Sequence, residues 1–235
     1  MPSKNALILK FLLTSAEEYE TDNISKQLEL YDFKVYNYKI HNGKELEDAL
    51  RSGIKYDLLY LSAHGNEDGF TNEVVDYTST WRDFGEHIYN SFCLAEENIL
   101  LLSCCRGGLN KVAYEMFYIC DQIEYICGPR ISLDSSQMLI GFNIFLFNKE
   151  YQGIDPVVAT EKILNATDIR FKCFDRIETV TETGYQLHVQ MIEKIPVDFN
   201  QDGNLDGIIV MEKDKDGLIY SEEDAKEQST KGNQN

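Results

Sequence analysis

Short apolar runs alternate with segments of helical spacing through most of the chain. The apolar and β-branched runs predict strands, and the segments between them place apolar residues three and four apart, which predicts helices. The predicted strands are ALILKFLL, FKVYNYKI, YDLLYLS, NILLLS and IEYICG, which begin at residues 6, 33, 56, 98 and 123. The predicted helices cover residues 16–30, 44–52, 80–91, 108–120, 134–148 and 156–166. This alternation is typical of repeated βαβ units.

Two of the predicted strands have no polar interruption. Residues 58–61 and 99–102 are continuously apolar, as in parallel strands that helices cover on both faces. The last predicted helix has its own start signal, with Asp155 as N-cap and Pro156 at the first helical position. We therefore predict an α/β fold with a doubly wound, mostly parallel sheet and helices on both of its faces.

The pattern changes after residue 167, so residues 1–167 are predicted to form the main domain. Residues 168–195 contain two β-like stretches around the turn residue Gly184, which predict an appended C-terminal β-hairpin. Residues 196–225 are acidic and punctuated by glycine. Residues 226–235 are polar with nothing to bury, which predicts a disordered end.

Composition and charge narrow the class of protein. The chain has 235 residues, of which 43% are hydrophobic, enough for one sizeable core. Its 22 Lys and Arg against 40 Asp and Glu give a net charge of −18, which disfavours nucleic acids and anionic membranes as partners. No apolar run of the sequence reaches the roughly 18 residues that a membrane-spanning helix needs.

The cysteines and the start of the chain bear on location. Six cysteines lie mostly in apolar runs and form no CxxC pair, which favours reduced thiols in a cytoplasm and gives no support to structural zinc. Residues 4–16 can be read as a short signal peptide, but Lys10 interrupts the apolar stretch, and a first β-strand reads equally well.

Two strand ends carry reactive side chains, in YLSAHGNEDGF at 60–70 and LLLSCCRGG at 100–108. In open α/β sheets, ligands bind at the carboxyl ends of the strands, so we expect His64 and Cys105 at one edge. A thiol beside an imidazole is a nucleophile beside its base, because an imidazolium favours the reactive thiolate. Gly65 leaves its N–H open to a substrate carbonyl, and with the N–H of Cys105 it is a candidate oxyanion hole.

Each of these residues also has a plain structural interpretation. His64 can be a loop histidine and Cys105 a small buried hydrophobic residue, since free cysteines are among the most buried side chains. If Cys105 faces the cleft, Cys104 is expected to pack in the core, because successive strand residues face opposite sides. The flanking glycines and the joint placement at strand ends favour catalysis.

The two motifs, LSAHGNEDGF and LSCCRGG, resemble the His-Gly and cysteine motifs of the caspase-like cysteine peptidases. His64 precedes Cys105 by 41 residues, near the caspase spacing of about 50. Residues 125–166, YICGPRISLDSSQMLIGFNIFLFNKEYQGIDPVVATEKILNA, resemble the segment after the cysteine in the bacterial CHAT-type branch. The resemblance implies a cysteine endopeptidase that cleaves a protein or peptide and needs no cofactor for its chemistry.

The sequence departs from this family at the specificity positions. Ser103 stands where caspases have the glutamine that helps to bind a substrate aspartate, and Ile131 stands where the CHAT branch has tryptophan. Asp134 matches the acidic residue in the substrate pocket of related Arg- and Lys-directed peptidases, which implies cleavage after a basic residue. Asp134 is also a candidate helix N-cap, since Gln137 completes a capping-box variant, and the two roles are compatible.

The acidic segment contains two patterns of calcium-binding loops. DFNQDGNLDG at 198–207 spaces oxygen donors around a turn glycine, and EKDKDGLIYSEE at 212–223 repeats the pattern. The first loop has Ile209 where an EF-hand has its bidentate glutamate, so it is only EF-hand-like. The alternative is an acidic tail that binds nothing specific. The candidate calcium ligands are Asp198, Asn200, Asp202, Asn204, Asp206, Glu212, Asp214, Asp216 and Glu223.

As a whole, the sequence favours a cysteine endopeptidase with a Cys105–His64 dyad. The alternative is a catalytically inactive caspase-like module that binds partners and responds to calcium. A nucleotide-binding domain is disfavoured, because neither a P-loop nor a GxGxxG motif follows the first predicted strand.

Overall fold

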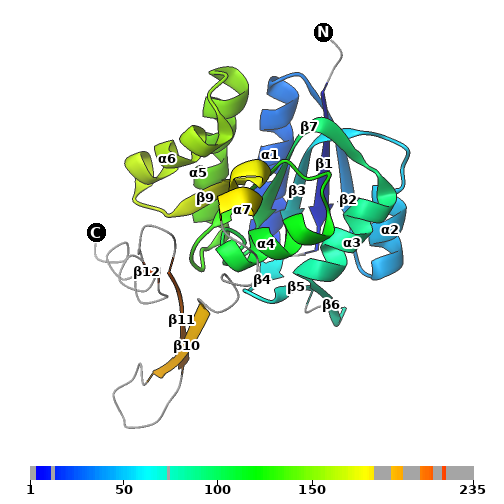
Figure 1. The fold of residues 1–235 in the computed structure, drawn as a ribbon. Coiled ribbons are helices and arrows are strands. Elements are labelled where there is room, and N and C mark those ends of the chain that lie inside the picture. Colours follow the sequence, from blue (N-terminus) through cyan, green and yellow to red (C-terminus); the bar gives the residue numbers. More distant parts are fainter. Residues whose placement is uncertain are drawn as a thin grey trace.

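A six-stranded sheet forms the centre of the protein in the computed structural model (Figure 1). The structure describes residues 4–11, 14–72 and 75–182, and the strand segments 192–197, 207–213 and 219–220. The strand order is β2-β1-β3-β7-β8-β9, and every neighbouring pair is parallel except β8 and β9, so the mostly parallel sheet is confirmed. The strands are β1 (Lys4–Lys10), β2 (Phe33–Lys39), β3 (Tyr56–Ser62), β7 (Leu94–Ser103), β8 (Tyr125–Pro129) and β9 (Phe171–Asp175).

Helices cover both faces of this sheet, which confirms the predicted layers. In β1, Ala6 and Ile8 pack under α1, α5 and α6, whereas Leu7 and Leu9 pack under α2, α3 and α4. Because both faces are buried, strands such as β1 have no polar side, which explains their continuously apolar sequences. The helices are α1 (Ser15–Leu30), α2 (Gly43–Leu50), α3 (Trp81–Ser91), α4 (Asn110–Ile119), α5 (Ser135–Leu146) and α6 (Pro156–Thr167).

Side-chain caps begin the helices close to where the sequence predicts them. Asp155 accepts hydrogen bonds from the backbone N–H groups of Val157 and Val158, and Pro156 is the first residue of α6. At the start of α1, Thr14 and Glu17 form a reciprocal capping box. The helix α5 continues into a single π-helical turn, η1 (Phe147–Tyr151).

A small antiparallel sheet lies at the carboxyl edge of the main sheet, directly after β3 (Figure 1). Its middle strand is anchored in the core by Phe70, whose ring packs 4.9 Å from Phe11 and 5.5 Å from Trp81. The indole N–H of Trp81 donates to the carbonyl oxygen of Asn66 at 2.9 Å. These contacts fix the segment that follows β3 against the body of the protein. The strands are β4 (His64–Gly65), β5 (Gly69–Asn72) and β6 (Tyr77–Thr80).

The segment after residue 167 differs from the predicted hairpin. Its first stretch forms β9, the sixth strand of the main sheet, and helix α7 (Arg176–Glu182) follows directly. The reason is burial on both sides, because Phe171 and Cys173 pack in the core of one sheet face and Phe174 in the core of the other. The main sheet therefore extends beyond residue 167. The predicted turn at Gly184 lies outside the described residues.

Three further strands form a separate antiparallel sheet in the order β10-β11-β12. They are β10 (Ile192–Val197), β11 (Gly207–Lys213) and β12 (Ile219–Tyr220). The first predicted calcium loop, 198–207, therefore lies between two strands rather than two helices. The described part of the second, 212–223, consists of the end of β11 and the strand β12, so the described residues form no EF-hand pair of helices there. The predicted disordered end, 226–235, lies outside the described residues. Among the helices that the structure describes, none has the length and apolar character to cross a membrane.

Candidate active site

His64 and Cys105 occupy equivalent positions beyond two neighbouring parallel strands. Ser62 of β3 and Ser103 of β7 are paired in register, and the N–H of Ala63 donates to the carbonyl oxygen of Ser103 at 3.2 Å. His64 and Cys105 each follow a paired serine by two residues, so both lie at the carboxyl edge of the sheet. Both side chains lie toward the face that α1 and α5 cover, since His64 is beside Glu17 of α1 and Cys105 is beside Leu133, just before α5. The structure thus brings the two predicted residues to one edge.

Cys105 differs from the other cysteines in its exposure. Cys105 is partly exposed, whereas the other five cysteines are buried. Its Sγ–H donates to the carbonyl oxygen of Leu133 at 3.6 Å, so the thiol lies beside the segment that leads into α5. Cys104 is 1% exposed in the core under α4, where burial raises the pKa of its thiol well above the ordinary range. The prediction that Cys104 packs in the core is confirmed.

Gly65 permits a close approach between the histidine and cysteine segments. A Cβ atom at this position would lie 2.6 Å from the Cβ of Cys104 and 3.3 Å from the carbonyl oxygen of Cys105. The N–H of Asn66 donates to the carbonyl oxygen of Gly69, which makes their pair a hydrogen-bonded one and leaves Gly65, the next residue, at a non-hydrogen-bonded position. The N–H of Gly65 therefore points away from β5.

The turn after β7 has an unusual backbone. Arg106 has φ of 62°, a left-handed conformation that is uncommon outside glycine. Its N–H donates to the carbonyl oxygen of Ile131, and the N–H of Gly108 donates to the carbonyl oxygen of Pro129 at 2.8 Å. A Cβ at position 108 would lie 2.0 Å from the backbone oxygen of Gly128, so only glycine fits there. These contacts hold the residue that follows Cys105 in one conformation.

Two ion pairs join this turn and α4 to the segment after β4. The guanidinium of Arg106 donates from Nη1 to Glu67 Oε2 at 2.8 Å, and both side chains are largely buried. Lys111, in the first turn of α4, pairs with Asp68. The sequence assigns these four residues no role. The Arg106–Glu67 pair differs from the Lys111–Asp68 pair because both of its side chains are largely buried. A sequence pattern does not show such burial.

His64 has a carboxylate neighbour that sequence reasoning missed. Its Nε2 lies 3.7 Å from Oε1 of Glu17, whose side chain is 9% exposed, while the imidazole is about half exposed. The other carboxylate oxygen of Glu17 accepts the N–H of Thr14 at 3.1 Å, so the capping box holds Glu17 in place. The signal in the sequence was the Thr-x-x-Glu spacing at the start of the first helix.

A second carboxyl group of α1 lies beneath the site. Oε1 of Glu20 accepts hydrogen bonds from the Tyr60 hydroxyl at 2.6 Å and from the Ser103 hydroxyl at 2.5 Å. Burial raises the pKa of Glu20 to about 7, and the charge of nearby Glu17 acts in the same direction, against the two hydrogen bonds. Ser103, at the position of the caspase glutamine, thus points to α1.

Asp134 is the N-cap of α5, as one of its two predicted roles requires. Its Oδ1 accepts the N–H of Gln137 at 2.9 Å and the hydroxyl of Ser136 at 2.6 Å, and Gln137 completes the capping box. The side chain is exposed and directly follows Leu133, the residue whose carbonyl accepts the Cys105 thiol. Capping is therefore confirmed, and Asp134 is adjacent in the chain to the residue that contacts the candidate nucleophile.

The predicted calcium ligands lie almost entirely outside the described residues. Glu212 is the exception, and it belongs to strand β11, opposite Ile192 and Tyr220. Within the described residues, no group of three or more His, Cys, Asp or Glu side chains is arranged to hold a metal ion.

No family model matches this sequence, and no curated protein matches it. Solved structures similar to it include two proteases. One is an inactive zymogen C11 protease from Parabacteroides distasonis, with a TM-score of 0.49 and 12% identity, which covers 77% of this chain and 64% of its own. The other is a secreted C11 cysteine protease from Bacteroides thetaiotaomicron in complex with an irreversible peptide inhibitor, with a TM-score of 0.46, 9% identity and coverages of 98% and 69%. The chain thus spans about two thirds of the length of each.

Proposed function

We propose that this protein is a cysteine endopeptidase in which Cys105 is the nucleophile and His64 is its base. The observation that carries the proposal is the register of β3 and β7, which sets both residues two positions beyond a paired serine. The partial exposure of Cys105, unlike the buried thiols, gives it access to a substrate. The caspase-like motifs around the two residues, with the CHAT-like segment 125–166, favour a peptide bond as the target.

The proposed chemistry proceeds through an acyl-enzyme and needs no cofactor. His64 takes the proton of the Cys105 thiol, and the thiolate forms a C–S bond to the scissile carbonyl carbon. The N–H groups of Gly65 and Cys105 stabilise the resulting oxyanion. The C–N bond then breaks as His64 returns the proton to the leaving amine. Water, deprotonated by His64, hydrolyses the thioester and regenerates the thiol.

Two acidic residues extend this proposal. The carboxylate of Glu17 lies 3.7 Å from Nε2 of His64, and we assign it the orientation of the imidazole ring. Asp134 presents an exposed carboxylate beside the Leu133 carbonyl, and we assign it the recognition of a basic residue before the cleaved bond. The net charge of −18 favours the approach of such cationic peptides.

Alkylation of Cys105 by iodoacetamide across pH, read by peptide mass spectrometry, tests the dyad without knowledge of the substrate. We expect Cys105 to react faster than the buried cysteines and to lose this advantage in His64→Ala. Cys104→Ala is the matched control, because it removes the neighbouring thiol and should leave the labelling of Cys105 unchanged. Cleavage of fluorogenic peptides that end in Arg or Lys, abolished in Cys105→Ala, is the expected activity.

An inactive binding module is the second candidate function, and one observation favours it. The thiol of Cys105 donates to Leu133, and the imidazole of His64 faces Glu17, so each side chain has a partner outside the pair. Such a module has no need of a reactive thiol. Slow labelling of Cys105 at every pH, with wild-type folding, would favour this function over the peptidase.

We also propose that the two acidic loops near the C-terminus bind calcium. Val197 and Gly207 are paired across β10 and β11, so the two ends of the first loop are adjacent. Its donors, spaced from Asp198 to Asp206, are the hard oxygen ligands that calcium prefers. Calorimetric titration with calcium should give saturable heat in the native protein and less in Asp202→Ala. Equal heats in both would exclude this loop as a site.

A further inference from the structure

We propose that Cys127 and Cys173 are a redox-sensitive pair of thiols, which a small peroxide converts to a disulfide that ties strand β9 to strand β8. Both are free thiols in this structure, buried in the apolar cluster under α1, α5 and α6. The inference goes beyond the proposed function and does not depend on it, because the proposed chemistry uses neither thiol.

The register of the two strands sets the cysteines opposite each other. Cys127 of β8 pairs with Cys173 of β9 in an antiparallel ladder. Three positions further along, the N–H of Arg130 donates to the carbonyl oxygen of Arg170 at 2.8 Å, which marks a hydrogen-bonded pair. Because hydrogen-bonded and non-hydrogen-bonded pairs alternate along such a ladder, the two cysteines form a non-hydrogen-bonded pair.

The other end of the ladder gives the same assignment. There the N–H of Arg176 donates to the carbonyl oxygen of Glu124 at 2.9 Å, again three positions from the cysteines. In a non-hydrogen-bonded pair the Cα atoms are about 4.5 Å apart and the side chains are at their closest. This separation lies within the range of about 4.4–6.8 Å that a disulfide spans between Cα atoms.

The two thiols also lie on one face of the sheet and interact. Directly opposite residues of an antiparallel pair share a face, and a side-chain hydrogen bond links the thiols of Cys173 and Cys127. The Sγ of Cys127 lies 3.6 Å from the hydroxyl oxygen of Thr160 on α6. The exposed fraction is 0% for Cys127 and 5% for Cys173. The pair is therefore enclosed, and Cys173 is its more accessible member.

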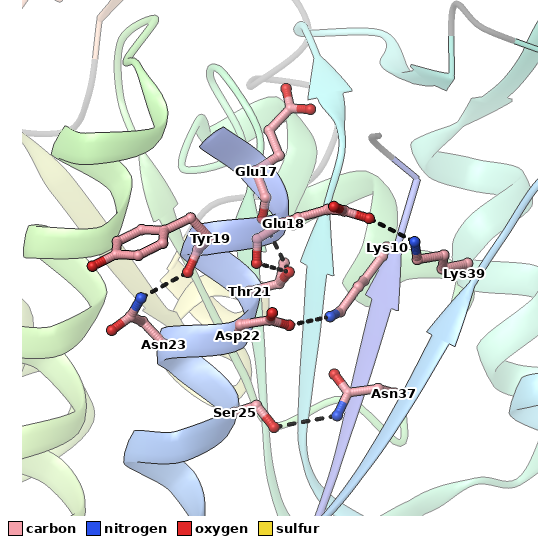
Figure 2. A network of polar contacts seen from close by, with 10 residues as sticks. All are labelled: Lys10, Glu17, Glu18, Tyr19, Thr21, Asp22, Asn23, Ser25, Asn37 and Lys39. Carbon is pink, nitrogen blue, oxygen red and sulfur yellow. Dashed lines mark hydrogen bonds and ion pairs between the residues drawn. The ribbon is translucent and has the colours of Figure 1, made fainter. Parts of the chain in front are cut away.

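A link between these residues would act on one edge of the main sheet, since β9 is the last strand in its order. At the opposite edge, ion pairs join helix α1 to the strands, and Lys10 of β1 contacts Asp22 at 2.9 Å. Lys39 of β2 contacts Glu18 in the same way, as Figure 2 shows. The disulfide would give the β9 edge a covalent attachment.

Strand β8 also supports the turn after Cys105. The carbonyl oxygen of Pro129, two residues after Cys127, accepts the N–H of Gly108 at 2.8 Å. The carbonyl oxygen of Ile131 accepts the N–H of Arg106. A covalent link at Cys127 therefore anchors the strand on which this turn rests.

Hydrogen peroxide is small enough to suit a nearly closed core, and its reaction with the pair balances. The Cys173 thiolate attacks one peroxide oxygen: an S–O bond forms, the O–O bond breaks, and the leaving hydroxide takes up the thiol proton as water. The Cys127 sulfur then attacks the sulfenic acid, so that an S–S bond forms, the S–O bond breaks, and a second water leaves with the Cys127 proton. The two thiols lose two electrons, and the peroxide is reduced to two waters.

The rate of this reaction should depend on pH. Burial raises the pKa of Cys173 well above its ordinary value, and the neighbouring Cys127 acts in the same direction. Little of the reactive thiolate is then present at neutral pH. We expect the pair to oxidise more slowly than the partly exposed Cys105, and faster at pH 9 than at pH 7.

Peptide mapping of the folded full chain tests the inference. The protein is held in hydrogen peroxide, the peroxide is removed with catalase, free thiols are blocked with iodoacetamide in denaturant, and the chain is digested without reductant. We expect a linked pair of peptides that contain Cys127 and Cys173, lighter by two hydrogens than the two thiol peptides and separated by dithiothreitol. Cys173→Ala should lose the link. Cys120→Ala is the matched control, because it removes an equally buried thiol from the other face of the sheet and should keep the link.

Thermal unfolding measures whether the link ties the strands together. It closes a loop of about 45 residues, so the midpoint of the oxidised protein should exceed that of the reduced protein by about 5–10 °C. Cys120→Ala should show the same rise, and Cys173→Ala should show none. A linked protein that unfolds at or below the midpoint of the reduced protein would overturn the role of the disulfide as a tie.

Other outcomes would overturn the pair itself. These are Cys127 and Cys173 both recovered as blocked thiols after a day in peroxide, a sulfinic acid at either residue without a link, or a link that forms only in the unfolded chain. Labelling of Cys105, which tests the peptidase, plays no part in these readouts. The proposed function can therefore fail while the thiol pair stands, and the reverse.

Discussion

Arg106 and Glu67 form a largely buried ion pair of 2.8 Å that joins the turn after β7 to the turn after β4. The pair connects the segment that holds Cys105 to the segment that holds His64, and it does so at a residue with a left-handed backbone. Removal of one side chain would take away a close opposite charge from the other, which is largely buried. Two variants at position 106 separate the contribution of the ion pair from that of the backbone.

Arg106→Ala should lower the free energy of unfolding by about 3 kcal/mol, because it removes one side of a largely buried ion pair. Arg106→Gly loses the same ion pair but adopts φ of 62° without strain. We expect the glycine variant to be more stable than the alanine variant by about 1 kcal/mol. Urea unfolding of the two variants measures the difference, and equal midpoints would show that the backbone at this position is unstrained.

Gly65→Ala should damage both stability and thiol reactivity. The added Cβ would lie 2.6 Å from the Cβ of Cys104, so β4 must shift, at a cost of about 1–3 kcal/mol. A displacement of His64 by a fraction of an ångström should slow the alkylation of Cys105 about tenfold or more. Gly43→Ala is the matched control, because its Cβ would meet nothing closer than 3.6 Å.

A second substitution makes the cause of the Gly65→Ala effect testable. Cys104→Gly removes the atom that the new methyl group would strike. In a double-mutant cycle, the stability lost in Gly65→Ala should shrink when Cys104→Gly is already present. Strictly additive effects would show that the close contact with Cys104 is not the source of the loss.

Asp134 offers a substitution that keeps the helix cap and removes the charge. Asparagine is as good an N-cap as aspartate, so Asp134→Asn should leave stability nearly unchanged, while Asp134→Ala should lose about 1 kcal/mol. If the carboxylate recognises a basic residue, both variants should lose the preference for Arg- and Lys-ending peptides over neutral ones. A preference retained in Asp134→Asn would contradict that role.

The buried carboxyl of Glu20 should also make stability depend on pH. Burial raises its pKa from 4.5 to about 7, so the folded state binds a proton that the unfolded state releases. Its stability contribution is therefore complete below pH 4.5 and is lost as the pH rises to 7. Relative to the wild type, Glu20→Gln should gain up to about 3 kcal/mol across this range. A constant difference between the two proteins in urea titrations from pH 4 to 8 would contradict the burial.

The sequence predicts the layers of the fold well because each layer rests on local periodicity. The strands YDLLYLS and NILLLS and the helix that begins at Pro156 all form close to their predicted positions. The first stretch of the hairpin expected after residue 167 joins the main sheet for a nonlocal reason, since Phe171 and Phe174 are buried on opposite faces of a sheet whose neighbouring strand lies over 40 residues earlier. An alternation of apolar and polar residues with a period of two is compatible both with a separate hairpin and with a strand of the main sheet.

The sequence likewise predicts some residues of the candidate site and not others. His64 and Cys105 follow predicted strand ends, and a parallel register is enough to bring them to one edge. Glu17 and Glu20 could not be placed from the pattern, because their roles depend on which residues of α1 face the end of a sheet. That depends on how the helix packs against the sheet, and the helical period alone does not specify this packing.

The bond between Ser103 and Glu20 spans 83 residues of chain, so the first helix leaves the ribosome long before the strand that completes its surroundings. Until that strand arrives, Glu20 is a solvated carboxylate on a helix that has nothing to enclose it. Cys105 reaches the edge of the sheet that holds His64 only when β7 joins β3. Under the proposed function, a nascent chain therefore has no complete site, and assembly of the sheet is the event that completes it.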